Sequence, residues 1–377
     1  MVVHTDTRAV EDITAGIDDE NPTATGEPES PTGRRYVKET GIIAVGAVAT
    51  LVAAVIGIKV GTDGATFAGI LDTFWSKITG NIPDNVVERR TQQIVWELRV
   101  PRVAVAILGG AALAIAGVLF QGLLRNPLVS PYTLGIAPAA AFGASVAIIV
   151  FGASASGSGV VLVAGALIAA LLNTVLVLTL ASTKQLDATT LILLGIALTQ
   201  LFSALTAGLQ YFTDDEVLAA IVRWTWGSVN GSVWYQVNTL LILVVTAYIY
   251  VQYRSGAVNA IAFAGDDAAK SLGVPVTRVR LEIIAVAAVL TAVTIAFTGI
   301  IGFVGLVGPH IARLIIGANH RFLIPFSAVI GALLLVIADA VGRIVLAPAV
   351  IPVGIIDALI GAPIFIYLIL TRRKALA

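Results

Sequence analysis

The stretch Gly302-Phe-Val-Gly-Leu-Val-Gly-Pro-His-Ile-Ala-Arg313 is apolar and rich in glycine, yet shorter than a membrane-crossing helix needs. We therefore expect it to begin from a tight turn at Gly299–Gly302. It is the eighth of ten apolar segments separated by short polar breaks. The segments are approximately 41–60, 102–123, 133–152, 159–181, 188–211, 236–253, 280–299, 301–316, 326–347 and 351–371. Most reach the roughly 18 residues that cross a bilayer, which predicts an all-α membrane protein, a polytopic bundle of about ten transmembrane helices.

The composition supports the same class. Of 377 residues, 58% are hydrophobic and 12% are charged, about half the charged share of a soluble domain. A soluble core could not hide so much apolar surface, so lipid must solvate much of it. The formal net charge is zero, which argues against a nucleic-acid partner. The absence of cysteine excludes disulfides, thiolate metal sites and cysteine nucleophiles.

The sequence also lacks the motifs of common catalytic sites. It contains no G-x-x-x-x-G-K-[ST], no H-E-x-x-H and no G-x-S-x-G. His4, His310 and His320 are too scattered to suggest a metal site. We therefore expect no catalytic residue, no metal and no cofactor in this chain, and no ATP hydrolysis by the chain itself.

Residues 1–40 differ from the rest. Eight acidic residues against one arginine lie between Asp6 and Glu29, with Pro22, Pro28 and Pro31 interrupting the segment. Such a segment cannot bury enough apolar surface to fold, so we interpret it as a disordered acidic cytoplasmic tail before a transmembrane domain at 41–377.

Charge then predicts the orientation. Ten spans put both termini on one side, and the loops on that side carry fifteen basic residues against eight opposite. The excess favours both termini in the cytoplasm. Six of the eight lie between Lys59 and Arg102, on the connection 61–98 or directly beside it, and this connection also carries a helical stripe of apolar residues. The stripe predicts an amphipathic helix, either lying in the outer interface or packed on the outer ends of the bundle. Its residues are Phe67, Ile70, Leu71, Phe74, Trp75 and Ile78.

Asp339 and Asp357 are the clearest charged groups within the spans. An acidic residue there is a functional candidate by default, as a proton relay or ion site. Both lie near predicted outer ends, close to Arg343, so a structural ion pair or helix-end role is the favoured interpretation. An ion-coupled secondary transporter that uses these two carboxylates is the alternative.

The polar loop at 259–275 is the richest on the predicted inner face. Asp266 and Asp267 can cap a short helix carrying Ala268, Ala269 and Leu272, which Gly273 ends. A helix of small residues suits insertion into a groove on a partner. An ordinary capped loop helix explains the local pattern equally well.

From about Ile94 to Leu370 the chain resembles the membrane subunit of binding-protein-dependent ABC importers for iron chelates and vitamin B12. Several long motifs occur in the order typical of that family, and the tail before residue 40 is not covered. The matching stretches are Arg99-Val-Pro-Arg102, 117–128 with Arg-Asn-Pro-Leu, Gly135-Ile136, 299–313, Asp339-x-x-x-Arg343, 346–354 and Gly361-Ala-Pro363.

The resemblance implies a type II ABC importer permease in the plasma membrane. Its expected partners are a second copy in a homodimer, two cytoplasmic ATPase subunits, an external substrate-binding protein and the lipid bilayer. The expected substrate is vitamin B12 (cobalamin), a ferric siderophore or haem, and the motifs do not separate these chelates.

The resemblance also implies roles for individual residues. Arg99, Arg102 and Arg343 match arginines that hold acidic residues of the binding protein, with snorkelling helix-end arginines as the alternative. Asn126, Thr189 and Thr190 match gate residues of the pathway. The loop that docks on the ATPase corresponds to Asp266, Asp267, Ala268, Ala269, Leu272 and Gly273, with aspartate where the family pattern has glutamate.

Overall fold

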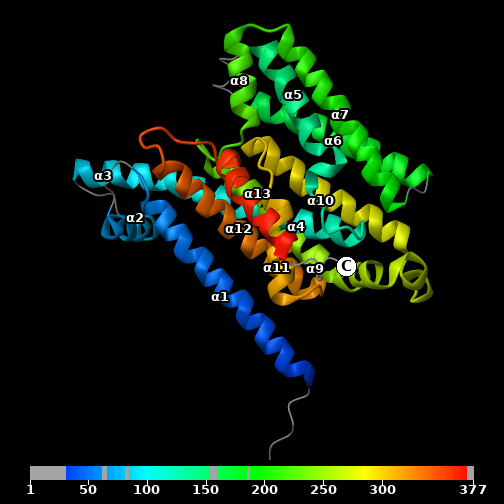
Figure 1. Ribbon diagram of the computed structural model, residues 1–377. Helices are drawn as coiled ribbons and strands as arrows, with labels where there is room; N and C mark the ends of the chain where they lie inside the picture. Colours follow the sequence, from blue (N-terminus) through cyan, green and yellow to red (C-terminus); the bar gives the residue numbers. More distant parts are fainter. Residues whose placement is uncertain (1–30, 62–65, 81–84, 153–158, 185–186, 372–377) are drawn as a thin grey trace, which may run out of the picture. The chain divides into compact units, whose positions relative to one another are not determined.

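The computed structural model of the chain describes residues 31–61, 66–80, 85–152, 159–184 and 187–371, and these residues form helices and no strand (Figure 1). The α-helices are α1 (Pro31–Lys59), α2 (Phe67–Thr79), α3 (Val86–Gln93), α4 (Val100–Leu123), α5 (Ile136–Phe151), α6 (Gly159–Lys184), α7 (Ala188–Tyr211), α8 (Asp215–Thr225), α9 (Trp234–Ser271), α10 (Val276–Thr298), α11 (Val304–Ile316), α12 (His320–Ile344) and α13 (Val353–Thr371). A π-helical turn, η3 (Ile94–Arg99), joins α3 to α4, and a 3₁₀ turn, η4 (Pro131–Leu134), precedes α5.

The ten predicted apolar segments coincide with ten of these helices. Seven stretches of the described chain are long and apolar enough to cross a membrane, and they contain α1, α4, α6, α7, α9, α10 and α12. Apolar but shorter helices account for the other three segments, α5, α11 and α13. The prediction of a polytopic helical bundle is confirmed.

Two units divide the chain, residues 1–38 and residues 39–377. The predicted acidic tail lies mostly outside the described residues, and α1 begins at Pro31, ten residues before the predicted span.

Helix α4 is the central helix of the larger unit. It packs against α9, α10, α11 and α12, and almost all of its side chains from Gly109 to Leu123 are buried. Glycines set the closest approaches: a Cβ at Gly110 would collide with the backbone of Gly331 in α12, and one at Gly117 with that of Gly305 in α11. Small residues at such crossings let membrane helices pack closely without a hydrophobic driving force. Helices α5, α6, α7 and α8 form a second group beside this centre, coloured green in Figure 1.

The predicted break before α11 is present, but residues 299–302 form an irregular non-helical segment and not a tight turn. The chain is not helical between Thr298 and the start of α11, and Ile301 is fully buried. Irregular backbone within a membrane bundle needs polar partners from the protein. Phe303 N–H donates to Asp357 Oδ2 over 2.9 Å, and Tyr132 donates its hydroxyl to the carbonyl of Ile301. These partners explain why α11 can be short.

The amphipathic stripe of the 61–98 connection forms α2, as predicted. Ile70 is buried and the Phe74 ring meets the Trp96 ring edge to face at 5.8 Å, so this part of the stripe packs on the bundle. Leu71, Trp75 and Ile78 are two-thirds or more exposed. Packing on the bundle is thus confirmed for Ile70 and Phe74, and a place in the outer interface stays a prediction for the exposed side of the helix.

Candidate functional site

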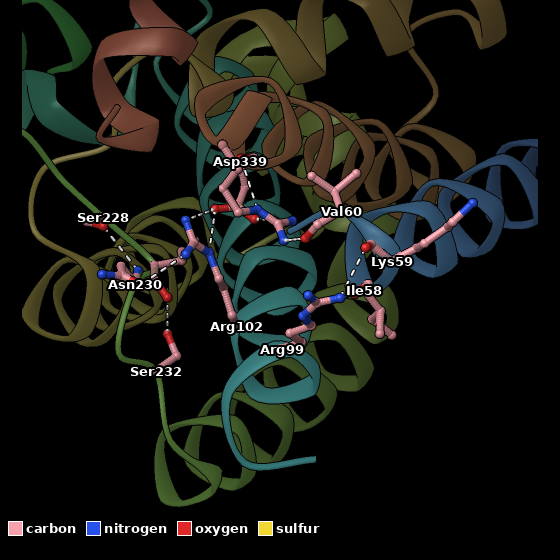
Figure 2. A network of polar contacts seen from close by, with 11 residues as sticks. Ile58, Lys59, Val60, Arg99, Arg102, Ser228, Asn230, Ser232 and Asp339 are labelled. Atoms are coloured by element: carbon pink, nitrogen blue, oxygen red, sulfur yellow. Dashed lines mark hydrogen bonds and ion pairs between the residues drawn. The ribbon is translucent and has the colours of Figure 1, made fainter. Parts of the chain in front are cut away.

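Arg102, Asp339 and Arg343 form a buried ion-paired triad between α4 and α12. Arg102 Nη2 lies 2.8 Å from Asp339 Oδ1, and Arg343 Nη2 lies 2.8 Å from Asp339 Oδ2. The Asp339 side chain is only 2% exposed. Figure 2 shows Arg102 reaching from α4 to Asp339, with Asn230 on its other side, where Arg102 Nη1 donates to Asn230 Oδ1 over 2.9 Å. The structural ion pair predicted for Asp339 is confirmed.

Two arginines donate hydrogen bonds to backbone carbonyls at the end of α1. Arg99 Nη1 donates to the carbonyls of Ile58 and Lys59 over 2.8 and 3.0 Å (Figure 2), and Arg343 Nη1 donates to that of Val60 over 2.6 Å. The last carbonyls of a helix lack partners within the helix and carry partial negative charge, so guanidinium groups stabilise them. Arg99 and Arg343 therefore act as helix-end residues.

The structure thus brings together the three arginines that the sequence singled out. We call Arg99, Arg102, Arg343 and Asp339 the arginine cluster. Each guanidinium in it has a partner within the chain, which corresponds to the helix-end interpretation. A docking role for these arginines stays a prediction.

Asp357 also has a structural partner. Its carboxylate is buried and accepts from Phe303 N–H at the start of α11, where the helix dipole favours negative charge. Asp339 and Asp357 therefore both bind groups of the chain itself. This arrangement gives no support to the ion-coupled alternative.

The predicted partner-binding loop, 259–275, is here called the coupling segment. It contains the C-terminal part of α9, which is broken at Gly265 (φ 83°, ψ 174°), a left-handed conformation that favours glycine. The short helix that follows ends at Gly273 (φ 81°), and Val274 N–H donates to the carbonyl of Ala269 over 3.0 Å. This six-to-one bond and the left-handed Gly273 form the Schellman ending that the sequence indicated.

Two details of the coupling segment differ from the expectation. Asp266 does not serve as a simple cap, because both of its carboxylate oxygens accept from Arg280 Nη2, over 2.8 and 2.9 Å. Ala269 is fully buried in the core of its own chain and so does not face a partner. Asp267, Ala268, Leu272 and Gly273 are exposed. The short helix thus turns only part of its small-residue surface outward, because the other part anchors it to the bundle.

The predicted gate residues lie at helix ends. Asn126 follows α4 and accepts from Leu128 N–H over 2.9 Å. Thr189 and Thr190 are exposed in the first turn of α7, where Asp187 Oδ1 accepts from Thr190 N–H over 2.9 Å. The hydrogen bonds from Thr190 hold the pKa of the Asp187 carboxyl below its usual value. No hydrogen bond between described residues joins Asn126 to Thr189 or Thr190.

Sequence reasoning missed a group of polar residues beside Asn126. Arg313 of α11 donates through Nη2 to Gln121 Oε1 of α4 over 3.1 Å. His320, at the start of α12, is buried nearby. A usable signal existed: Arg313 is a charged residue within the predicted span 301–316, and such residues are functional candidates. The group emerges only when α4, α11 and α12 are packed together.

Arg125 takes a left-handed conformation (φ 47°) directly after α4, at a position where glycine is preferred. Asn126 N–H donates to the carbonyl of Gln121 over 3.2 Å and closes the helix end. A residue with a Cβ pays about 1–2 kcal/mol for this conformation. Backbone strain of this kind occurs most often at functional sites.

Comparison with known proteins identifies the group to which this arrangement belongs. Residues 49–371 match the FecCD transport family. The chain is 40% identical to the vitamin B12 import system permease protein BtuC of Vibrio cholerae, over 75% of this chain and 85% of that protein. It is 36% identical to the hemin transport system permease protein HmuU of Yersinia pestis, over 74% of this chain and 84% of that one.

A solved structure has the same fold. It is assigned to a metal-chelate type ABC transporter in an inward-facing conformation and superposes with a TM-score of 0.75. Its sequence is 32% identical, and the match covers 88% of this chain and 99% of that one. With most of the chain matched by the family and by relatives above 30% identity, the chain belongs to the FecCD transport family.

Proposed function

We propose that this chain is the membrane-spanning permease subunit of an ATP-driven, binding-protein-dependent importer for a metal chelate. Its substrate would be vitamin B12 (cobalamin), haem or a ferric siderophore. The family match over residues 49–371 carries the proposal, and the relatives named for vitamin B12 and hemin transport support the substrate class. Cobalamin is our first choice, since the vitamin B12 permease is the more similar of these two relatives.

The proposed complex contains two copies of this chain, two ATPase subunits and an external binding protein. Helices α6 and α7 support the second copy, since large apolar side chains such as Leu172, Leu193 and Leu201 are exposed on them. Lipid or another protein must cover such a surface. The substrate would pass between the two copies.

The test of function is ATP-dependent uptake. Proteoliposomes containing the permease, its ATPase and the binding protein should take up labelled cobalamin when ATP is supplied inside. An ion gradient imposed on vesicles that contain the permease alone should drive no uptake. Uptake in those vesicles would establish the secondary-transporter alternative instead.

The exposed side of the coupling segment is the proposed ATPase contact. Asp267, Ala268 and Leu272 are exposed while Ala269 is buried, so a substitution at Ala268 changes the surface and leaves the packing intact. Ala268→Arg should abolish co-purification of the ATPase with an unchanged melting temperature. Ser182→Arg, at an exposed position near the end of α6, is the matched control and should retain the ATPase. Equal ATPase yield for both variants would remove the coupling segment from the interface.

For the arginine cluster we propose that Arg102 is the residue best placed to contact a binding protein, because its side chain remains 11% exposed. A lost charge-assisted contact costs about 1.5–3 kcal/mol, or roughly a ten- to hundredfold weaker complex. The weakening is measured as the affinity of the binding protein for the permease–ATPase complex that carries Arg102→Gln. An unchanged affinity would leave Arg102 with a structural role alone.

We further propose that both termini are cytoplasmic. The natural chain has no cysteine, so single engineered cysteines report their side without background. A cysteine replacing Thr5 should resist a membrane-impermeant thiol reagent in intact cells, and one replacing Asn81 should react. The reverse pattern would invert the topology.

A further inference from the structure

A pocket of about 190 Å³ lies where α4 ends, and we call it the polar pocket. Its walls come from the end of α4 and the loop after it, from α9 just before the break at Gly265, and from α11 and the start of α12. Its lining residues are Gln121, Gly122, Arg125, Asn126, Pro127, Ala262, Phe263, Arg313, Ala318 and His320. The pocket is many times larger than the roughly 10–15 Å³ of free space that one water needs.

The charge of the polar pocket is positive and uncompensated. Arg125 and Arg313 both line it, and its lining residues include neither aspartate nor glutamate. Among the described residues, Arg313 donates only to the neutral amide of Gln121, and Arg125 makes no hydrogen bond or ion pair. A partly buried guanidinium without an anion is costly, since burial removes water and supplies no opposite charge.

Buried polar atoms around the pocket also lack partners. Gln121 and His320 are only 2% and 3% exposed. Gln121 Nε2, Arg313 Nε and His320 Nε2 find no hydrogen-bond partner in the part of the chain that the structure describes. The first two are donors, as an anion requires. Unsatisfied buried groups are rare in folded proteins, so three around one pocket point to a bound ligand.

His320 adds an acceptor. Asn259 Oδ1 accepts from His320 N–H over 2.9 Å and lies 2.8 Å from Nδ1 of the same residue. An oxygen that already accepts from a backbone amide requires the proton to be on Nδ1. In the neutral ring Nε2 is then a free lone pair.

We propose that the polar pocket binds a phosphate-type oxyanion. Arg125, Arg313 and Gln121 Nε2 would bind its oxygens, and its remaining P–OH group would donate to His320 Nε2. The pocket touches four helices, α4, α9, α11 and α12, so the bound ion would join the end of α4 to the part of the coupling segment that precedes Gly265. The predicted gate residue Asn126 lines this site, so the proposal adds a ligand beside the proposed pathway, and its test needs no transport.

Two glycines keep the site open. A Cβ at Gly122 would collide with the His320 imidazole, and one at Gly265 would lie 2.9 Å from Arg125 Nη1. The left-handed backbone of Arg125 places its guanidinium beside the break in α9. An alanine at Gly122 would therefore narrow the pocket without removing a charge.

The experiment measures binding of radiolabelled inorganic phosphate to the purified full-length chain in nanodiscs of zwitterionic lipid. We expect one saturable site with a Kd of about 1 mM or tighter. Arg125→Gln, at an exposed position, should fold normally and bind roughly tenfold more weakly, and Arg125→Gln with Arg313→Gln should abolish binding. Arg278→Gln is the matched control, because Arg278 is exposed and paired with Glu282 outside the pocket. Binding by Arg125→Gln equal to that of the natural chain would overturn the proposal.

The phosphate group could come from free phosphate or from a lipid headgroup. Native mass spectrometry of chains from nanodiscs containing phosphatidic acid counts retained lipid. If the lipid is the source, the natural chain should retain one phosphatidic acid, and added phosphate should displace it. The double variant should retain none. If neither probe binds the natural chain better than the double variant, the site does not exist.

The preference of the pocket for phosphate over sulfate tests whether His320 Nε2 accepts a hydrogen bond from the ion. Sulfate has the shape of phosphate but carries no proton at neutral pH, so it cannot donate to Nε2. Phosphate should bind at least several-fold more tightly than sulfate, and Gly122→Ala should weaken phosphate binding by displacing the imidazole. Equal affinity for the two ions would remove His320 from the site.

Discussion

The two ends of α4 use arginine in different ways. At its beginning, Arg102 and Arg343 share the carboxylate of Asp339, and every guanidinium of the arginine cluster meets an oxygen of the chain. At its other end, Arg125 and Arg313 line the polar pocket without a carboxylate among the lining residues. The residue type is the same, but only one end contains the opposite charge.

The difference separates structural from ligand-binding charge. A buried carboxylate paired with two guanidinium groups holds α4 and α12 together, and losing one partner is expensive. A partly buried cation such as Arg313, whose counter-charge is absent, costs free energy until an anion binds. Substitution should therefore have opposite consequences at the two ends, which the following measurements test.

The largest effect is expected at Asp339. Asp339→Asn keeps the shape of the side chain but leaves two buried guanidinium groups without their anion. We expect a loss of about 3–5 kcal/mol in unfolding free energy. Denaturation of the purified chain in detergent measures it, with Asp267→Asn as the control because that carboxylate is fully exposed. A loss equal to the control would show that the triad is not paired.

Arg102→Gln should have a smaller effect. Arg343 stays beside Asp339, so the carboxylate keeps one cation, and only the hydrogen bonds to Asp339 and Asn230 are lost. We expect about 1.5–3 kcal/mol of destabilisation by the same measurement. If Arg102→Gln costs as much as Asp339→Asn, Arg343 is not an effective second partner.

Arg313→Gln should behave differently from Arg102→Gln, although the substitution is the same. Removing the Arg313 charge also removes the free-energy cost of burying it without an anion. This gain offsets the loss of the hydrogen bond to Gln121. In phosphate-free buffer we expect a change within about 1 kcal/mol of zero. Added phosphate should stabilise the natural chain more than the variant, which keeps only Arg125 in the pocket. A loss as large as that of Arg102→Gln in phosphate-free buffer would mean that Arg313 already has its counter-charge.

The smallest effect on stability is expected at Arg125. The side chain is exposed, and in the described structure it makes no hydrogen bond, so Arg125→Gln should change the unfolding free energy by no more than about 0.5 kcal/mol. Arg125→Gly should stabilise the chain slightly, because glycine adopts the left-handed conformation without strain. The melting temperatures of Arg125→Gln and Arg125→Gly, compared with that of the natural chain, test both expectations. Destabilisation by glycine would show that the arginine side chain itself supports the fold.

Much of the architecture could be predicted from composition and segment length. The ten apolar segments, the short α11 with the break before it, the amphipathic α2 and the Gly273 ending of the coupling segment all follow from local chemistry, and each is present. The roles of individual charges were harder to predict. The sequence left Arg99 open between a contact with the binding protein and a helix-end role. In the structure it donates to carbonyls at the end of α1, about forty residues earlier in the chain, and the docking role stays a prediction.

Composition and local pattern are enough to identify the class of protein, the places where helices break and the residues that carry charge in an apolar chain. Hydrophobic length and glycine position act locally, so they can be read along the chain. Only the tertiary structure decided which charges are paired. Asp339 meets Arg102 across 237 positions, Gln121 meets Arg313 across 192, and Ala269 turns inward because the short helix must anchor to its own bundle. Pairing and burial depend on which helices lie side by side, and helix packing brings together groups that no local pattern connects.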